Sequence, residues 1–253
     1  MSNRLLTVEH LSKSFPRRDG SRQEAVRDVS FQLEQGETLG IVGGSGSGKS
    51  TLARLVTRLI APDAGRILLA GQDITRLKGR PLRQVQCRMQ MVFQSPAGSF
   101  DPRQTLVHAV AEPLCCQGMP RRLAVGRARS LLEQCGLPAD LADRRPGQVS
   151  GGQCQRAAIA RALTIGPRLL VCDEATSALD ATVQQQILDL LRQLRSQCGL
   201  AFLFICHDLA VVQQFCDRVL VLYGGRMVED GPVAEVLAHP RNAYTRALID
   251  AAW

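Results

Sequence analysis

Short runs of apolar residues recur along the chain, and polar stretches rich in glycine or proline separate them. Three runs between residues 4 and 42 predict strands: "RLLTVEHLSKSF", "AVRDVSFQLEQ" and "ETLGIVG". Further strands are predicted at "GRILLAGQDI", "QMVFQSP", "RLLVCDE", "LAFLFICHD" and, as a hairpin, "RVLVLYGGRMVEDG". Several of these runs are almost entirely apolar, which is typical of parallel strands that are covered on both faces.

Helical patterns alternate with the later strands. They cover about residues 49–59, "ATVQQQILDLLRQLRSQ" and "LAVVQQFC". This alternation predicts an α/β fold with a mainly parallel sheet, preceded by an N-terminal antiparallel β subdomain. Residues 95–150 hold helical stretches such as "RRLAVGRARSLLEQCGL" and no convincing strand. They are therefore expected to form a helical subdomain inserted into the core.

The chain of 253 residues has ample material for one large domain with a buried core. The tail "PVAEVLAHPRNAYTRALIDAAW" is expected to form two short helices broken at His239-Pro240. We predict a single domain over residues 1–253, composed of a β subdomain with the first part of the core (1–94), the helical subdomain (95–150), the rest of the core (151–231) and a C-terminal helical tail (232–253).

Charge and cysteine content narrow the setting in which the protein works. The formal net charge is +8, but the arginines stand in short groups without interleaved aromatic residues. This pattern favours solvated faces over a nucleic-acid surface. The nine cysteines include no C-x-x-C pair, which indicates a reducing, cytosolic setting. The start lacks the apolar core of a signal peptide, and no run approaches the roughly 18 apolar residues of a membrane span.

A phosphate-binding motif stands between a predicted strand and a predicted helix. The stretch "GGSGSGKST" matches G-x-x-x-x-G-K-[ST]. Glycines let the backbone N–H groups converge on a phosphate, the lysine contacts the outer phosphates, and the serine can ligate Mg²⁺. The motif predicts a P-loop NTPase core that binds a nucleoside triphosphate. Its candidate residues are Gly43, Ser45, Gly46, Gly48, Lys49, Ser50 and Thr51.

Two adjacent carboxylates follow the apolar strand "RLLVCDE". Asp173 at the strand end is a candidate to hold the Mg²⁺ of the nucleotide. Glu174 is a candidate to orient or deprotonate an attacking water, a role worth about 10²- to 10⁴-fold in rate. A solvated strand end is the alternative for such a pair. The pair together with the phosphate loop predicts hydrolysis.

A second helix start, in "QVSGGQCQRAAIARAL", has unusually bare backbone. Ser150 and Gln153 match the Ser-x-x-Gln capping box. Glycine inside a helix costs about 1 kcal/mol relative to alanine, so Gly151 and Gly152 predict a close approach by either a packed neighbour or an anion. Because one phosphate loop implies one nucleotide, an anion here would belong to a nucleotide held by another copy.

The ordered motifs resemble those of the nucleotide-binding subunit of an ABC transporter, and the likeness covers essentially the whole chain. They are "GGSGSGKST", Gln94 in "VFQSP", "VSGGQ", "LLVCDEATSALD" and His207 in "FLFICHD". The resemblance implies that two subunits enclose two ATP molecules, each held between one subunit's phosphate loop and the other's signature. It also implies Mg²⁺ as cofactor, a peripheral position on the cytoplasmic face of the inner membrane, and transmembrane permeases as partners.

The resemblance assigns further roles residue by residue. The signature Ser150–Gln153 would touch the partner's γ-phosphate, and Asp180 would lie in the loop facing that partner. Gln94 would contact Mg²⁺ or the attacking water and relay to the permeases, and His207 would contact the γ-phosphate. Phe15 stands where the family places an aromatic ring against adenine, although tyrosine is commoner there and a core phenylalanine is the alternative.

Two segments, "VHAVAEPL" and "HPRNAYTRAL", resemble the ATPases of the peptide and nickel importer family. This likeness implies uptake of nickel, a metal chelate or a di- or oligopeptide, delivered by a solute-binding protein. It also implies pairing with a different ATPase chain, with a homodimer as the second choice. The rival class is a soluble ABC ATPase acting on nucleic acid or ribosomes. Such proteins typically carry long coiled coils, zinc-binding cysteines or two cassettes, and none is seen here, so no nucleic-acid partner is expected.

Overall fold

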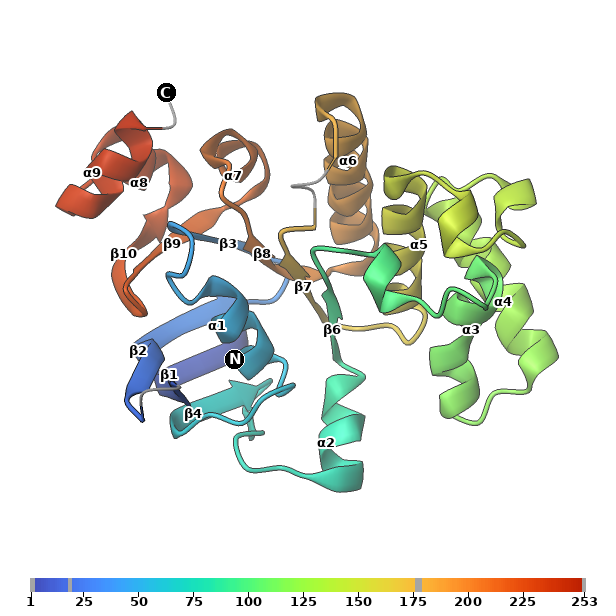
Figure 1. Ribbon diagram of the computed structural model, residues 1–253, viewed down its shortest axis with the longest axis horizontal. Helices are drawn as coiled ribbons and strands as arrows, with labels where there is room; N and C mark the ends of the chain where they lie inside the picture. The colour runs from blue at the N-terminus through green and yellow to red at the C-terminus, as the bar shows by residue number, and fades with distance from the viewer. Residues whose placement is uncertain (1–2, 18–19, 176–178, 252–253) are drawn as a thin grey trace.

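The computed structural model describes residues 3–17, 20–175 and 179–251. An antiparallel sheet holds the N-terminal strands in the order β2-β1-β4-β5 (Figure 1). Long β1 and β2 pair along most of their length, and β4 pairs with the other edge of β1. The strands span Arg4–Pro16 (β1), Arg22–Glu34 (β2), Ala64–Leu69 (β4) and Gln72–Asp73 (β5).

A second, six-stranded sheet forms the core, in the order β10-β9-β3-β8-β7-β6. The neighbours from β9 to β6 pair in parallel, and β10 pairs antiparallel to β9 as a hairpin. The carboxyl ends of the five parallel strands therefore lie along one edge. The strands span Thr38–Val42 (β3), Met89–Val92 (β6), Leu169–Asp173 (β7), Ala201–Ile205 (β8), Arg218–Tyr223 (β9) and Arg226–Pro232 (β10).

Alternate residues of the central strands feed two separate hydrophobic clusters. In β8, Phe202 and Phe204 pack with the helices on one face, whereas Leu203 and Ile205 pack with the antiparallel sheet and a helix on the other. Successive strand residues point to opposite faces, so both faces of β8 must be apolar when both are covered. Figure 1 shows α5, α6 and α7 on one side of this sheet and α1 with the antiparallel sheet on the other. The predicted α/β class with a mainly parallel sheet is confirmed.

The helices occupy the positions that the sequence predicts, with two differences. An additional helix, α2, separates β5 from β6, and α1 ends at Val56 rather than near residue 59. The early end follows from Arg58, which adopts a left-handed φ of 56° and donates from Nε to the Ile74 carbonyl at 3.0 Å. The helices span Lys49–Val56 (α1), Gly79–Gln86 (α2), Leu106–Cys116 (α3), Arg121–Gln134 (α4), Gly151–Leu163 (α5), Ala181–Cys198 (α6), Leu209–Phe215 (α7), Val233–Ala238 (α8) and Ala243–Asp250 (α9).

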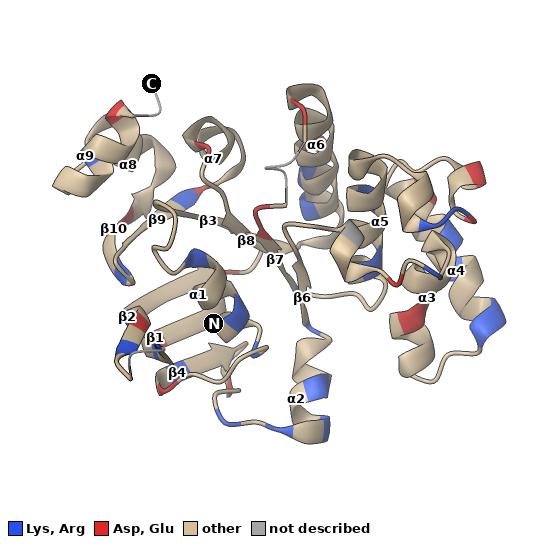
Figure 2. Ribbon diagram, viewed as in Figure 1, with Lys and Arg blue, Asp and Glu red and all other residues tan. Residues whose placement is uncertain are grey.

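The region predicted as a helical subdomain contains α3, α4 and three short 3₁₀ turns. The break between α8 and α9 falls at His239 and Pro240, as predicted. The domain limits 1–94, 95–150, 151–231 and 232–253 remain a prediction. Figure 2 shows both basic and acidic residues in the antiparallel sheet, and basic residues alone along α2. Within the described ranges, no helix combines the length and apolar character that crossing a membrane requires.

Candidate functional site

The phosphate loop, residues 43–50, leaves the end of β3 and runs into α1. Its glycines are required by backbone conformation and by close neighbours. Gly48 caps α1 with φ 105°, and a Cβ on it would collide with the Ala25 carbonyl. Gly43 has φ 150°, and its Cβ would collide with the Leu222 carbonyl. Only glycine takes these conformations without strain, so the loop backbone can pass close to the Ala25 and Leu222 carbonyls.

Lys49 lies beneath this loop with 7% of its surface exposed. Its Nζ donates to the carbonyls of Gly43 at 2.7 Å and Gly44 at 2.9 Å. An ammonium group has three donors, so one remains for a ligand. Burial lowers the pKa of Lys49, and the nearby carboxylates Glu174 and Asp173 oppose that shift. A phosphate beside Nζ would stabilise the charged form further.

Ser50 and Asp173 meet at the carboxyl edge of the core sheet. The Ser50 hydroxyl donates to Asp173 Oδ1 at 2.9 Å, although the two residues are 123 positions apart. Burial raises the pKa of Asp173, and the hydrogen bond from Ser50 opposes it. A hydroxyl and a carboxylate are hard oxygen donors of the kind that Mg²⁺ prefers. Among the described residues no three His, Cys, Asp or Glu gather as a metal cage.

Glu174 and Gln94 form the second polar pair of the site. The Gln94 amide donates to Glu174 Oε2 at 2.6 Å, joining the segment after β6 to the end of β7. Glu174 has a φ of 50°, and its N–H donates to the Ile205 carbonyl at 3.0 Å. A non-glycine residue in the left-handed region stores strain, and such residues cluster at functional sites.

A pocket of about 490 Å³ brings most of the predicted residues together. Phe15, a residue that is 39% exposed, lines it, and Lys13 Nζ lies 5.6 Å from the centroid of its ring. An exposed ring at the rim of a phosphate site can stack on a nucleobase. The pocket is lined by Phe15, Gln23, Ala25, Ser45, Gly46, Ser47, Gly48, Lys49, Ser50, Thr51, Gln94 and Glu174.

The signature Ser150–Gln153 contributes no residue to that pocket. Ser150 caps α5 and Gln153 completes the predicted capping box, with contacts of 3.3 Å and 2.9 Å. The two glycines differ. A Cβ on Gly152 would stand 2.5 Å from Val183 Cγ1 of α6, whereas Gly151 is exposed and its Cβ would meet only Leu179 Cδ2, at 3.9 Å. Packing therefore explains Gly152, and Gly151 remains open to a ligand.

Asp180 and His207 also lie outside the pocket lining. Asp180 caps α6, because its Oδ1 accepts from the Val183 N–H at 3.0 Å. Residues 176–178 of the preceding motif lie outside the described residues. His207 is exposed two positions beyond β8, the strand that pairs with both β7 and β3. It therefore stands at the same sheet edge as Asp173.

One hydrogen bond of the phosphate loop is predicted by none of the sequence motifs. The Gly44 N–H donates to the Tyr244 hydroxyl of α9 at 2.7 Å. The tail segment "HPRNAYTRAL" marks this helix, but nothing in its pattern points back 200 residues to the loop.

Comparisons with known proteins agree with this geometry. The sequence profile of the family described as "ABC transporter" matches residues 26–177. A probable peptide ABC transporter ATP-binding protein, y4tS of Sinorhizobium fredii, is 48% identical over all of this chain and 73% of its own length. The oligopeptide transport ATP-binding protein OppF of Salmonella typhimurium is 44% identical over 90% of this chain and 69% of its own.

Solved structures give the same result. The ATP-binding cassette MJ0796, in a dimeric post-hydrolysis state bound to ADP and Pi, superposes with a TM-score of 0.83 at 28% identity, covering 90% of this chain and 99% of its own. The chain belongs to the ABC transporter family and is one of its ATP-binding, ATP-hydrolysing subunits.

Proposed function

We propose that this chain hydrolyses ATP as the peripheral subunit of an ABC importer, on the cytoplasmic face of a membrane. The observation that carries the proposal is the pocket in which the phosphate loop meets Gln94 and Glu174, with Asp173 bonded to Ser50 at its edge. A buried ammonium, a buried carboxylate and a strained glutamate at one sheet edge suit phosphoryl transfer to water.

Each residue has a distinct part in the proposed reaction. The loop N–H groups and Lys49 bind the phosphates, and Phe15 stacks on the adenine. Ser50, Asp173 and Gln94 would hold Mg²⁺, which, when bound, neutralises charge that develops on the phosphates. Glu174 orients the attacking water and accepts its proton, with Gln94 as its hydrogen-bond partner. His207, at the adjoining strand end, contacts the γ-phosphate.

The signature of a second subunit completes the site in this proposal. Ser150 and the open position at Gly151 begin a 13-residue helix whose N-terminal dipole favours an anion. Because they lie outside the pocket of their own chain, they suit the γ-phosphate held by a partner, with Asp180 at the same interface. The dimeric MJ0796 structure with ADP and Pi supports this arrangement. A different ATPase chain is the preferred partner, and a second copy is the next.

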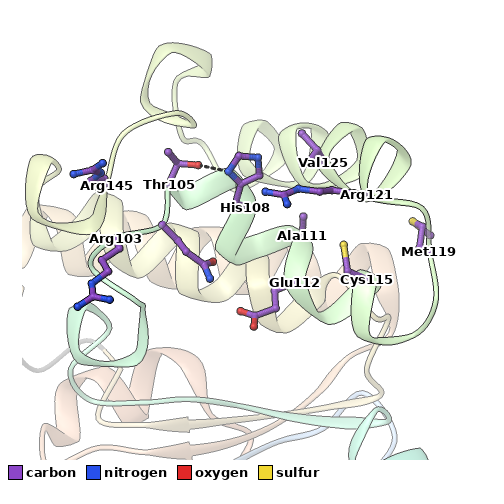
Figure 3. Close-up of a pocket in the computed structure, with 11 residues that line it drawn as sticks. Arg103, Thr105, His108, Ala111, Glu112, Cys115, Met119, Arg121, Val125 and Arg145 are labelled. Atoms are coloured by element: carbon purple, nitrogen blue, oxygen red, sulfur yellow. Dashed lines mark hydrogen bonds between the residues drawn. The ribbon is translucent and has the colours of Figure 1, made fainter.

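The permease is proposed to dock at the helical region. A pocket of about 590 Å³ lies between α3 and α4, and Arg103, from the segment before α3, also lines it (Figure 3). Its wall combines apolar Ala111, Met119 and Val125 with charged residues, a surface that suits an amphipathic permease helix. Closure of the ATP-bound dimer would move this region and so drive the permease.

A peptide is the proposed cargo, carried to the permease by a solute-binding protein. The relatives' names support this choice, because they include peptide, oligopeptide and glutathione import proteins. None of those names mentions nickel or a metal chelate, which therefore rank behind. The arginines stand in short groups without interleaved aromatic residues, a pattern that does not favour the nucleic-acid alternative.

Glu174→Gln tests the hydrolytic role. The variant should bind ATP like the wild type, because the amide keeps the shape of the carboxylate, but turnover should fall by about 10²- to 10⁴-fold. Lys49→Ala should instead lose ATP binding. With ATP, Glu174→Gln should double its apparent mass from 27.6 kDa, either alone or when mixed with the ATPase encoded beside it. Unchanged hydrolysis by Glu174→Gln would contradict the proposal.

A further inference from the structure

The C-terminal helix α9 contacts the phosphate loop at the peptide group after Gly43. That group joins Gly43 to Gly44. Its N–H donates to the Tyr244 hydroxyl at 2.7 Å, and its carbonyl accepts from Lys49 Nζ at 2.7 Å. A trans peptide is planar, and its C=O and N–H point in opposite directions. Tyr244 and Lys49 therefore hydrogen-bond to opposite edges of the same planar peptide group.

This arrangement couples the orientation of the Gly43–Gly44 peptide plane to the position of the Lys49 ammonium group. The neighbouring Gly44 carbonyl also accepts from Lys49 Nζ, at 2.9 Å. Glycine gives this stretch wide backbone freedom, so the peptide plane needs an external contact to fix it. Without the Tyr244 hydroxyl, the Gly44 N–H loses its partner, and a rotation that recovers one would carry the Gly43 carbonyl away from Lys49.

The tyrosine is itself held firmly. Its ring packs against Tyr223 at the end of β9, with ring centroids 4.2 Å apart. Asn242 caps the start of α9 by accepting from the Tyr244 N–H at 2.8 Å. The Glu229 carboxylate of β10 in turn accepts from the backbone of Arg241 at 2.8 Å and Asn242 at 3.1 Å. A continuous chain of contacts thus runs from the β9-β10 hairpin through α9 to the phosphate loop.

We propose that Tyr244 is a positioning residue for nucleotide binding, acting through the Gly43–Gly44 peptide on Lys49. The inference rests on the proposed binding of ATP phosphates to Lys49. It gives the C-terminal tail a part in the site, since the tail sets how readily the phosphate loop accepts a triphosphate.

The test is to remove one oxygen atom. Tyr244→Phe keeps the ring and loses the hydroxyl, and the matched control Tyr223→Phe removes the hydroxyl of the ring packed against it. Within the described residues that second hydroxyl makes no hydrogen bond, and Tyr223 is 56% exposed. The full-length chain should bind ADP with Mg²⁺ about two- to tenfold more weakly in Tyr244→Phe, the range of one neutral hydrogen bond, by calorimetry. Tyr223→Phe should match the wild type.

Kinetics separate positioning from general damage to the fold. In Tyr244→Phe the KM for ATP should rise by the same factor while kcat at saturating ATP stays unchanged. The melting transition without nucleotide should stay cooperative, with its midpoint lowered only by the few degrees that the loss of one hydrogen bond explains. Asn242→Ala, which loosens the start of α9, should weaken ADP binding in the same direction. Wild-type affinity in Tyr244→Phe, with Lys49→Ala still unable to bind, overturns this inference alone. Wild-type binding by Lys49→Ala would instead overturn the proposed function.

Discussion

Two adjacent glycines at the start of α5 do different work. Gly152 leaves no room for a side chain, because a Cβ would stand 2.5 Å from Val183 Cγ1. Valine is stiff about χ1 and cannot simply swing away. We expect Gly152→Ala to lower the free energy of unfolding by about 1–2 kcal/mol, since overpacking costs about 1–3 kcal/mol and the better helix propensity of alanine offsets part of it. Urea denaturation of the purified chain measures the change.

Gly151→Ala is the natural control, because its Cβ meets nothing closer than 3.9 Å. It should leave stability unchanged or slightly raised. The double variant Gly152→Ala with Val183→Ala should regain part of what Gly152→Ala loses, by restoring space at the contact. If Gly152→Ala were as stable as Gly151→Ala, packing against α6 would not be the reason for this glycine.

At the level of elements, α5 carries both a structural cap and the proposed phosphate contact, and one substitution separates them. Aspartate caps helices as well as serine does, and its charge favours a helix N-terminus. Ser150→Asp should therefore fold normally. Its charge would face the partner's phosphate, and like unit charges 4 Å apart near a surface repel by about 4 kcal/mol. In a Glu174→Gln background, we expect sedimentation to show that ATP no longer produces the dimer.

Ser150→Asn provides the neutral comparison, because asparagine also caps helices but adds no charge. It should keep most of the ATP-dependent dimer. Equal dimerisation of Ser150→Asp and Ser150→Asn would show that the start of α5 does not face a phosphate.

Features that depend on local sequence patterns could be predicted, whereas those that depend on long-range packing could not. Strands such as β7 and β8 follow from continuous apolar runs, and the phosphate loop follows from glycines that its backbone requires. Helix α2 was missed because only Val85 of its eight residues is buried, so it lacks an apolar face to recognise. The bond from Gly44 to Tyr244 could not be predicted, because it depends on how the tail packs against a distant hairpin.

At the scale of the whole molecule, the proposed coupling of ATP hydrolysis to transport needs the nucleotide pocket and the helical region to move together. The two are joined through the segment after β6, where Gln94 bonds to Glu174 and the chain then continues to the wall of the pocket between α3 and α4. A movement of Gln94 or Glu174 can therefore be transmitted along this segment to the proposed permease site. Because the nucleotide pocket and the pocket between α3 and α4 share no lining residue, a substitution in the latter should impair permease docking without impairing ATP hydrolysis.

Val125→Trp is such a substitution. Val125 lines the pocket of about 590 Å³, and an indole there would fill space that the permease helix needs. The isolated chain should hydrolyse ATP at the wild-type rate, because the nucleotide pocket is unchanged. Uptake of a labelled dipeptide by the assembled transporter in vesicles should fall at least about tenfold. The reason is that a displaced docking helix loses more binding free energy than the ~1.4 kcal/mol that a factor of ten represents. Leu123→Trp, on the same helix but 63% exposed and outside that lining, adds a similar ring without blocking the pocket. Equal uptake by the two variants would place the permease elsewhere on the molecule.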